Sequence, residues 1–137
     1  MKTKLVMTFG TFDLFHEGHK HYLKESKALG DKLIVVIARD KTVNEVKNFY
    51  PNQNEQIRLQ NVQNSHIPDL VILGSLNDKF QVLKEHKPDI IALGYDQKAF
   101  TENLNNFIID NDLSTKIVRI TSFHPDKYKS SIIKKSL

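Results

Sequence analysis

Hydrophobic residues gather along the chain in five short runs, separated by stretches in which apolar and charged positions recur at helical spacing. The apolar runs are nearly continuous rather than alternating, which is typical of strands covered on both faces and therefore of a mainly parallel sheet. The predicted strands are Lys4–Phe9, Lys32–Ala38, Asp69–Leu73, Asp89–Leu93 and Lys116–Ile120.

The stretches between these runs predict helices. The first extends from about Gly18 to Leu29 and has apolar positions three or four residues apart, with Gly30 as a stop signal. Further helices are expected to start near Asn54 or Glu55, to span Asp78–His86 and Thr101–Asn111, and to begin at Ser130. The segment Lys41–Gln53 has no clean period, and we interpret it as a long loop over the end of the second strand.

Strands and helices that alternate in this way predict an α/β fold. We expect residues 1–137 to form a single Rossmann-like domain, with an open, mainly parallel five-stranded sheet and helices on both faces. In such sheets ligands bind beyond the carboxyl ends of the strands, where the strand order reverses. The loops that follow Phe9, Ala38, Leu93 and Ile120 are therefore where functional residues are expected.

Composition narrows the class of protein. The chain contains no cysteine, which excludes disulfide scaffolds, thiolate metal sites and cysteine nucleophiles and fits a cytoplasmic location. The apolar run at the N-terminus is too short for a signal sequence or a membrane span. The net charge is +4, but Lys and Glu are interspersed. We therefore expect small anionic ligands, and neither a nucleic acid nor a membrane as partner.

The stretch TFGTFDLFHEGH combines several features of a phosphate site. His16 and His19 lie three residues apart on one side of a first helical turn, and Gly18 between them has no side chain to block a ligand. Backbone N–H groups and the positive end of the helix dipole lie at the same place. Two histidines at this spacing also suit a partial metal site or a helix surface. The strand, the GTFD turn and the helix around them favour phosphate chemistry.

GTFDLFHEGH, followed by a helix and LGDKLIVVIARD, resembles the nucleotidyltransferase superfamily with the H-x-G-H signature, in its cytidylyltransferase-like branch. Members transfer a nucleoside monophosphate from a triphosphate to a phosphate-bearing acceptor and release pyrophosphate. ARDKTV, KPDIIALGYDQ and KIVRITSF are similar to segments of archaeal-type FAD synthetases, which adenylate FMN. Glycerol-3-phosphate cytidylyltransferases, or related enzymes for small phosphomonoesters, are the alternative, because they share GTFDLLH-x-GH and LGD.

The resemblance implies roles for individual residues. His16 and His19 would donate hydrogen bonds to triphosphate oxygens in the transition state, with Lys47 as a further catalytic cation. The nucleotide would be bound by Gly10, Thr11, Phe12, His16, Gly18, His19, Gly94, Asp96, Ser130 and Ser131. The acceptor would be bound by Asp13, Lys41, Arg58 and Tyr95.

Several of these residues also have a structural interpretation. Asp13 would serve equally well as a cap of the following helix, and Ser130 as an ordinary N-cap. Arg58 would serve in structural pairing, and Tyr95 in packing. Between the two lysines that follow the second strand, we favour Lys47 over Lys41 for catalysis.

The resemblance is weaker near the C-terminus. Relatives open the last helix with three small hydroxyl residues, whereas this chain has Tyr128-Lys129-Ser130-Ser131, and His124 stands where cytidylyltransferases have an arginine. A nucleotide-binding module without activity is therefore a further alternative. Mg²⁺ is expected with ATP or CTP as the triphosphate, but no metal cage of protein ligands is visible in the sequence. The family further implies a homodimer.

Overall fold

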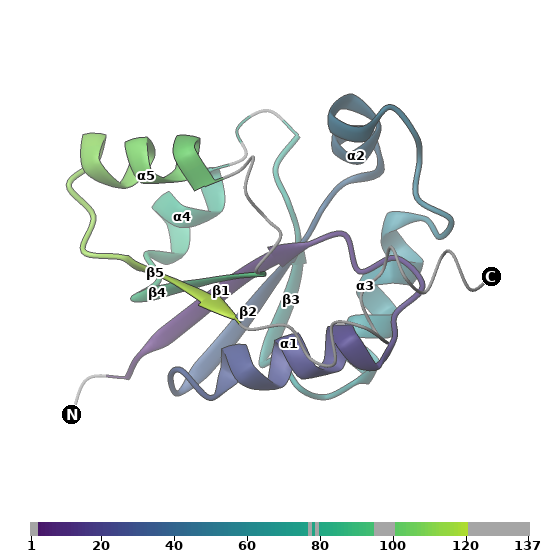
Figure 1. Ribbon diagram of the computed structural model, residues 1–137, viewed down its shortest axis with the longest axis horizontal. Helices are drawn as coiled ribbons and strands as arrows, with labels where there is room; N and C mark the ends of the chain where they lie inside the picture. The colour runs from purple at the N-terminus through teal and green to yellow at the C-terminus, as the bar shows by residue number, and fades with distance from the viewer. Residues whose placement is uncertain (1–2, 77, 79, 95–100, 121–137) are drawn as a thin grey trace.

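The computed structural model describes residues 3–76, 78, 80–94 and 101–120 (Figure 1). Its strands form one sheet in the order β3-β2-β1-β4-β5, and each neighbouring pair is parallel. They are β1 (Leu5–Gly10), β2 (Lys32–Ile37), β3 (Leu70–Leu73), β4 (Ile90–Gly94) and β5 (Lys116–Ile120). The α/β class, the Rossmann-like five-stranded sheet and its parallel strands are thus confirmed.

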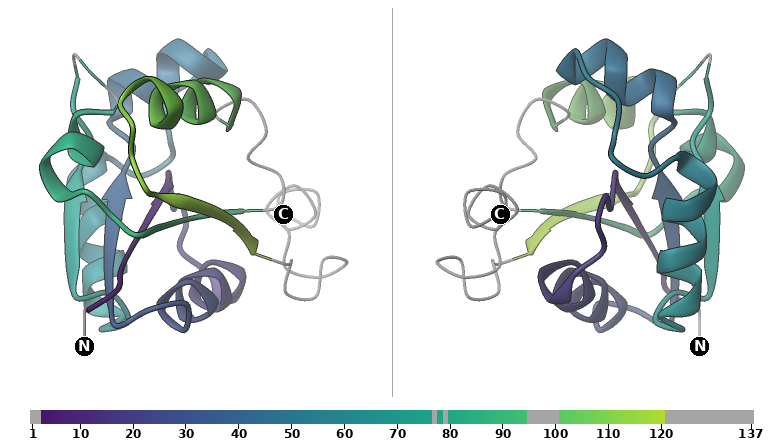
Figure 2. Two further views of the ribbon diagram at one scale, coloured as in Figure 1. Left: turned by 90° about the vertical axis from the view of Figure 1, so that its left-hand side faces the viewer. Right: turned by 90° about the vertical axis from the view of Figure 1, so that its right-hand side faces the viewer.

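Helices cover both faces of the sheet, as predicted (Figures 1 and 2). They are α1 (Glu17–Lys27), α2 (Asp40–Lys47), α3 (Glu55–Asn64), α4 (Gln81–His86) and α5 (Thr101–Asp110). Helices α1 and α3 pack on one face, and α4 and α5 on the other. The helix predicted to begin at Ser130 lies outside the described residues.

The core has two layers, one on each side of the sheet. Within β1, Val6 packs on the side of α1 and α3, whereas its neighbour Met7 packs on the side of α4 and α5. Both side chains are fully buried. Because successive residues of a strand point to opposite faces, a strand covered on both faces has to be apolar at every position. This alternation accounts for the continuous hydrophobic runs of the sequence.

The interpretation of Lys41–Gln53 as a loop throughout is wrong, because α2 occupies its first half. This helix ends at Asn48, which adopts the left-handed conformation with φ of 63°. Val43 is its one buried side chain and Val46 is exposed, so a single apolar residue anchors the helix to the core. Helix α2 stands beyond the carboxyl ends of β1 and β2, and its placement makes it part of the candidate site (Figure 1).

From β1 the chain adds β2 and then β3 on one side of the sheet, and then β4 and β5 on the other side. The strand order therefore reverses between β1 and β4. The carboxyl ends of β1 and β4, at Gly10 and Gly94, therefore border the crevice in which ligands of such sheets bind. Among the described helices, none is both long and apolar enough to cross a membrane.

Candidate active site

The turn after β1 is tightly folded around a buried aromatic ring. Phe12 and Leu14 both have positive φ angles, of 54° and 51°, which non-glycine residues rarely adopt. The Phe12 ring folds back over Gly10, where an added Cβ would lie 2.6 Å from Phe12 Cε2. Gly10 is therefore needed for close packing of the turn. Such strained backbone is often found at ligand sites.

His16 and His19 cap the start of α1 together. His16 is the N-cap, and its Nδ1 accepts a hydrogen bond of 3.0 Å from the Gly18 N–H. His19 Nδ1 in turn accepts a 3.2 Å hydrogen bond from the His16 N–H. The Gly18 N–H is therefore paired with the His16 side chain. The helix start offers imidazole groups to a ligand in its place.

These hydrogen bonds determine the tautomer of both histidines. A neutral ring whose Nδ1 accepts a hydrogen bond carries its proton on Nε2. The two rings stack with centroids 3.7 Å apart. Burial, together with the neighbouring His16, lowers the pKa of His19 to about 3. Burial also lowers the pKa of His16. Both rings are therefore neutral at pH near 7, with an Nε2–H group as hydrogen-bond donor.

Aromatic rings hold His19 in place. The Phe15 ring stacks on it at a centroid distance of 5.6 Å, and the Phe12 ring meets it edge-on at 5.4 Å. Tyr22, one turn further along α1, lies 6.1 Å from the Phe12 ring and donates a hydrogen bond of 2.8 Å to the Ala92 carbonyl in β4. The strained turn, the histidine pair and the sheet therefore form one packed unit.

Asp13 fastens the turn to the segment that precedes α3. Its carboxylate accepts hydrogen bonds from the backbone N–H groups of Asn52, at 2.8 Å, and Gln53, at 3.0 Å. Burial raises the pKa of Asp13, but these hydrogen bonds outweigh it and leave the pKa below its usual value. Asp13 does not cap α1, because His16 does. That alternative is wrong, and Asp13 instead holds the turn against Asn52 and Gln53.

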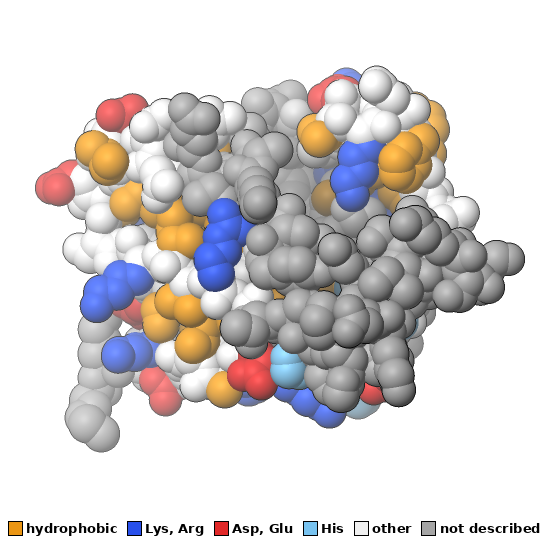
Figure 3. Space-filling model, viewed as in Figure 1, with side chains coloured by type: hydrophobic (Ala, Val, Ile, Leu, Met, Phe, Trp, Pro, Cys, Tyr) orange, Lys and Arg blue, Asp and Glu red, His pale blue; other side chains and the backbone are white. Residues whose placement is uncertain are grey.

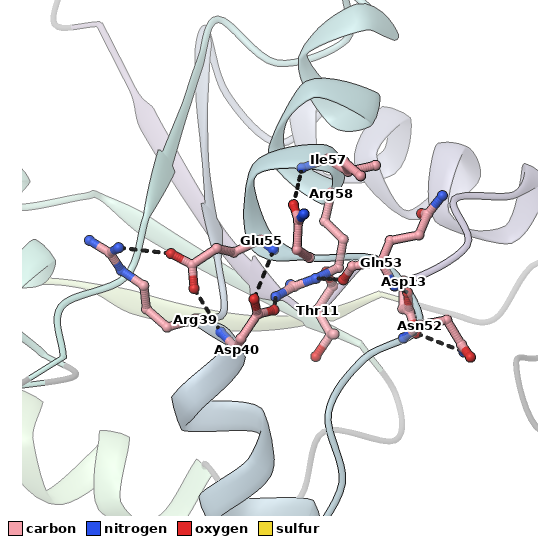
Figure 4. Close-up of polar contacts among 10 residues, drawn as sticks. Thr11, Asp13, Arg39, Asp40, Asn52, Gln53, Glu55, Ile57 and Arg58 are labelled. Carbon is pink, nitrogen blue, oxygen red and sulfur yellow. Dashed lines mark hydrogen bonds and ion pairs between the residues drawn. The ribbon is translucent and has the colours of Figure 1, made fainter.

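Arg58, at the start of α3, lies beneath the same turn and is completely buried. Its Nε donates to the Gln53 carbonyl at 2.9 Å, its Nη1 to the Thr11 carbonyl at 2.8 Å and its Nη2 to Asp40 Oδ1 at 2.7 Å (Figure 4). The structural pairing that the sequence left open for Arg58 is thus observed. Its side chain joins the turn after β1 to the starts of α2 and α3.

A second arginine extends this network to β3. Arg39 donates from Nε to the Gly74 carbonyl at 2.8 Å. Its Nη1 donates to Glu55 Oε2 at 2.9 Å (Figure 4). Sequence analysis missed Arg39, Asp40, Glu55 and Gln53 as members of the site. For Arg39 and Asp40, the signal in the sequence is their position just after β2, at the carboxyl edge of the sheet.

Lys41 and Lys47 both lie on α2 and are exposed. They are six positions apart, so their side chains leave the helix about 120° apart around its axis, and they cannot face the same ligand group equally. The C-terminal end of α2 and the residues after it expose the apolar side chains of Val46, Phe49 and Tyr50. Figure 3 shows hydrophobic and basic side chains together on this helix.

Next to β1 in the sheet, Gly94 ends β4. Its carbonyl accepts a hydrogen bond of 2.8 Å from Arg119 Nη1 on β5. Arg119 is thus a cation at the carboxyl edge that the sequence did not identify as part of the site. The predicted residues Tyr95, Asp96, Ser130 and Ser131 lie outside the described residues.

Metal-binding capacity is limited in the part of the chain that the structure describes. No group of three or more His, Asp or Glu side chains there is arranged to hold a metal ion. Asp13, whose charge acts on His19, is already bonded to Asn52 and Gln53. This arrangement fits Mg²⁺ that arrives with the phosphates of a nucleotide, because Mg²⁺ needs few protein ligands.

Comparisons with known proteins agree with this geometry. Residues 7–136 match the family described as Cytidylyltransferase-like. The FAD synthase of Thermoplasma volcanium is 42% identical over 132 residues, which cover 96% of this chain and 92% of the relative. The FAD synthase of Methanosarcina mazei is 47% identical over 116 residues, which cover 84% of this chain and 75% of the relative.

Solved structures share the fold. A crystal structure described as the lipopolysaccharide core biosynthesis protein of Thermoplasma volcanium is 43% identical, with a TM-score of 0.82, and the match covers 89% of this chain and 99% of that one. The pantoate-beta-alanine ligase of Francisella tularensis is 20% identical with a TM-score of 0.66, covering 89% and 60% of the two chains, and shares the fold alone. From the family match and these relatives it follows that this chain belongs to the cytidylyltransferase-like family.

Proposed function

We propose that this protein is an FMN adenylyltransferase, which transfers AMP from ATP to FMN and so makes FAD. The observation that carries the chemistry is the pair of neutral histidines, His16 and His19, held as Nε2–H donors at the start of α1. The acceptor follows from the relatives, because FAD synthases about 40% identical align over most of the chain. The enzyme class is nucleotidyltransferase.

The reaction needs no covalent enzyme intermediate. An oxygen of the FMN phosphate attacks the α-phosphorus of ATP, a P–O bond forms there, and the bond from that phosphorus to the β-phosphate oxygen breaks. Pyrophosphate leaves with the electron pair. Negative charge builds on the triphosphate oxygens, so catalysis depends on positioned donors. His16 and His19 supply two such donors, in rings that are fixed by stacking and by their own hydrogen bonds.

Further groups complete the proposed site. The turn Gly10–Phe12 would lie beside the nucleotide, and Gly94 and Asp96 beside its base and ribose. Ser130 and Ser131 would bind the outer phosphates. Mg²⁺, held mainly by the phosphates, would neutralise part of their charge.

The acceptor would lie on the side of Asp13, Lys41 and Tyr95, with Lys47 reaching the reacting phosphates from α2. Because the donors of Arg58 are taken up by protein oxygens, its contribution to acceptor binding would be indirect. We further propose that the protein works in the cytoplasm and as a homodimer.

Glycerol-3-phosphate cytidylyltransferase, the alternative function, is not favoured. The curated relatives that cover most of the chain are FAD synthases. FMN and glycerol 3-phosphate present the same reacting phosphate, so the histidine pair serves either acceptor equally. The choice between them depends on the part of the site that holds the rest of the acceptor.

Activity with defined substrates tests the proposal. Purified protein is incubated with Mg²⁺, with either ATP or CTP, and with either FMN or glycerol 3-phosphate, and both pyrophosphate release and flavin products are measured. We expect pyrophosphate in equal amount to FAD with ATP and FMN. Pyrophosphate release with glycerol 3-phosphate alone would overturn the choice of acceptor, and no release in any pairing would overturn the enzyme class. A protein with His16→Ala is the matched blank for contaminating activity.

A further inference from the structure

Arg58 has an unusual environment for a residue so close to the candidate site. Its side chain has no exposed surface, and all three kinds of guanidinium nitrogen are bonded to protein oxygens. We propose that Arg58 is a positioning residue. By holding the Thr11 carbonyl, it turns the N–H of Phe12 toward the crevice between β1 and β4 as a hydrogen-bond donor for the nucleotide's phosphates.

Peptide geometry connects the Thr11 carbonyl, which Arg58 binds, with the Phe12 N–H. The Thr11 carbonyl and the Phe12 N–H belong to the same planar peptide unit, and in a trans peptide they point in opposite directions. None of the described peptide bonds is cis. Arg58 Nη1 binds the carbonyl from α3, which covers β2 and β3. The N–H therefore points away from that half of the sheet, in the direction of β4.

The Phe12 N–H is also available. Within the described part of the chain it donates to no acceptor. The residue itself cannot rotate readily, because its ring is buried and packs between Gly10 and the rings of His19 and Tyr22. A backbone N–H that is fixed, unpaired and placed next to a histidine donor is the kind of group that binds phosphate oxygens without reorganisation.

The hydrogen bonds of Arg58 argue against direct contact between its guanidinium group and a bound acceptor. Two of its bonds fix backbone carbonyls, and the third pairs its charge with Asp40 at 2.7 Å. Moving the guanidinium toward a bound acceptor would break the hydrogen bonds of a buried charge to three partly buried oxygens, which is costly. A lysine at this position would bring one ammonium group, which cannot reach three oxygens in the directions of a planar fork.

A measurement on the unmodified protein tests the proposal directly. Amide signals are recorded by NMR with and without the α,β-methylene analogue of ATP and Mg²⁺. We expect the Phe12 amide signal to shift, and the amide to become more protected from exchange with solvent, when the analogue binds. If the analogue binds and the Phe12 amide neither shifts nor gains protection, the proposal is wrong.

A variant tests the part played by Arg58. With Arg58→Lys we expect kcat for FAD formation to fall by about 10²-fold, as for other misplaced catalytic groups, and the Phe12 amide to lose its response to the analogue. The matched control is Asp69→Asn. Asp69 accepts hydrogen bonds from the Leu33 N–H at 2.8 Å and from Lys27 Nζ at 3.0 Å, at the opposite edge of the sheet. This control should lose stability while kcat stays unchanged.

The outcomes separate this inference from the proposed function, on which its kinetic part rests. If Arg58→Lys lowers the unfolding temperature no more than Asp69→Asn and keeps the original kcat, Arg58 is purely structural and the inference is overturned. If the unmodified protein makes no FAD, the proposed acceptor fails, and the NMR measurement still decides the inference because it needs only the nucleotide. If Arg58→Lys does not fold, the NMR measurement on the unmodified protein still tests the contact between the Phe12 amide and the nucleotide, and absence of that contact overturns the inference.

Discussion

Asp40 and Glu55 each cap the helix that the other begins. Glu55 Oε1 accepts a hydrogen bond of 2.9 Å from the Asp40 N–H at the start of α2, and Asp40 Oδ2 accepts one of 3.2 Å from the Glu55 N–H at the start of α3. Each carboxylate also pairs with an arginine, Glu55 with Arg39 and Asp40 with Arg58. Two helix N-termini are thereby fastened together beside the turn after β1.

Replacing Glu55 separates its two contributions. Glu55→Ala removes both the cap of α2 and the partner of Arg39, and we expect the free energy of unfolding to fall by about 1 to 2 kcal/mol. Glu55→Gln keeps an oxygen that can accept from the Asp40 N–H and loses only the charge, so the fall should be smaller. Urea denaturation measures both. Equal losses in the two variants would show that the charge, and not the cap, is what matters.

Gly10→Ala should disrupt the turn after β1. The added methyl group would lie 2.6 Å from Phe12 Cε2, and the Phe12 ring has no room to retreat because it is buried against His19 and Tyr22. We expect a destabilisation of about 1 to 3 kcal/mol, the usual effect of overpacking. Nucleotide affinity should fall as well, measured by titration with the ATP analogue. Gly74→Ala is the control, because its Cβ would meet neighbours at an ordinary 3.6 Å.

Strands were easier to predict than the contacts that organise the site. The predicted strands agree with the structure to within one residue at each end, because a strand buried on both faces is a continuous apolar run. Helix α2 leaves no comparable pattern, since Val43 is its one buried side chain. Its start is stabilised instead by Glu55, fifteen positions away in sequence.

The contacts of the histidine pair and of Arg58 were likewise not predictable from the sequence. The sequence indicates that His16 and His19 lie on one side of a helix start, but not that each ring accepts a backbone hydrogen bond and so takes the Nε2–H form. For Arg58, burial depends on oxygens from separate segments, and Thr11 is 47 positions away. Such contacts form only when the chain is folded, so residue type and spacing do not reveal them.

Loss of either histidine should lower kcat with little change in the fold. His16→Ala and His19→Ala each remove one donor to the triphosphate oxygens, and we expect kcat to fall by roughly 10²–10³-fold. Each also removes part of the cap of α1, at a cost of about 1 kcal/mol. Steady-state kinetics and urea denaturation on the same samples separate the two effects. Full activity in either variant would contradict the proposed role of that histidine.

Helix α2 allows a direct comparison of its two lysines. Because Lys41 and Lys47 leave the helix about 120° apart, we expect one of them to lie closer to the reacting phosphates than the other. We expect Lys47→Ala to lower kcat by about tenfold or more, and Lys41→Ala to act mainly on the KM for FMN. Both are exposed, so neither change should affect stability measurably. The reverse pattern would exchange the two proposed roles.

Protein stability should decrease in mild acid because of His19. Burial lowers its pKa to about 3 in the folded protein, against 6.5 in the unfolded chain. Between these values the unfolded chain binds the extra proton, so stability is lost as the pH falls through this range. From about pH 7.5 to about pH 5 we expect a loss of about 2 kcal/mol from this residue.

The variant His19→Gln isolates the contribution of His19 to the pH dependence of stability. In His19→Gln the side chain can still accept a hydrogen bond from the N-cap residue, as glutamine does in capping boxes, but it cannot be protonated in this range. The carboxylates Asp13 and Asp69, whose pKa values are lowered, contribute in the same direction only nearer pH 4 and below. Urea denaturation at both pH values should therefore show a much shallower pH dependence in His19→Gln, with the remainder coming from His16. Identical pH dependence in the two proteins would mean that burial does not lower the pKa of His19 and that the ring titrates in the folded protein as it does in the unfolded chain.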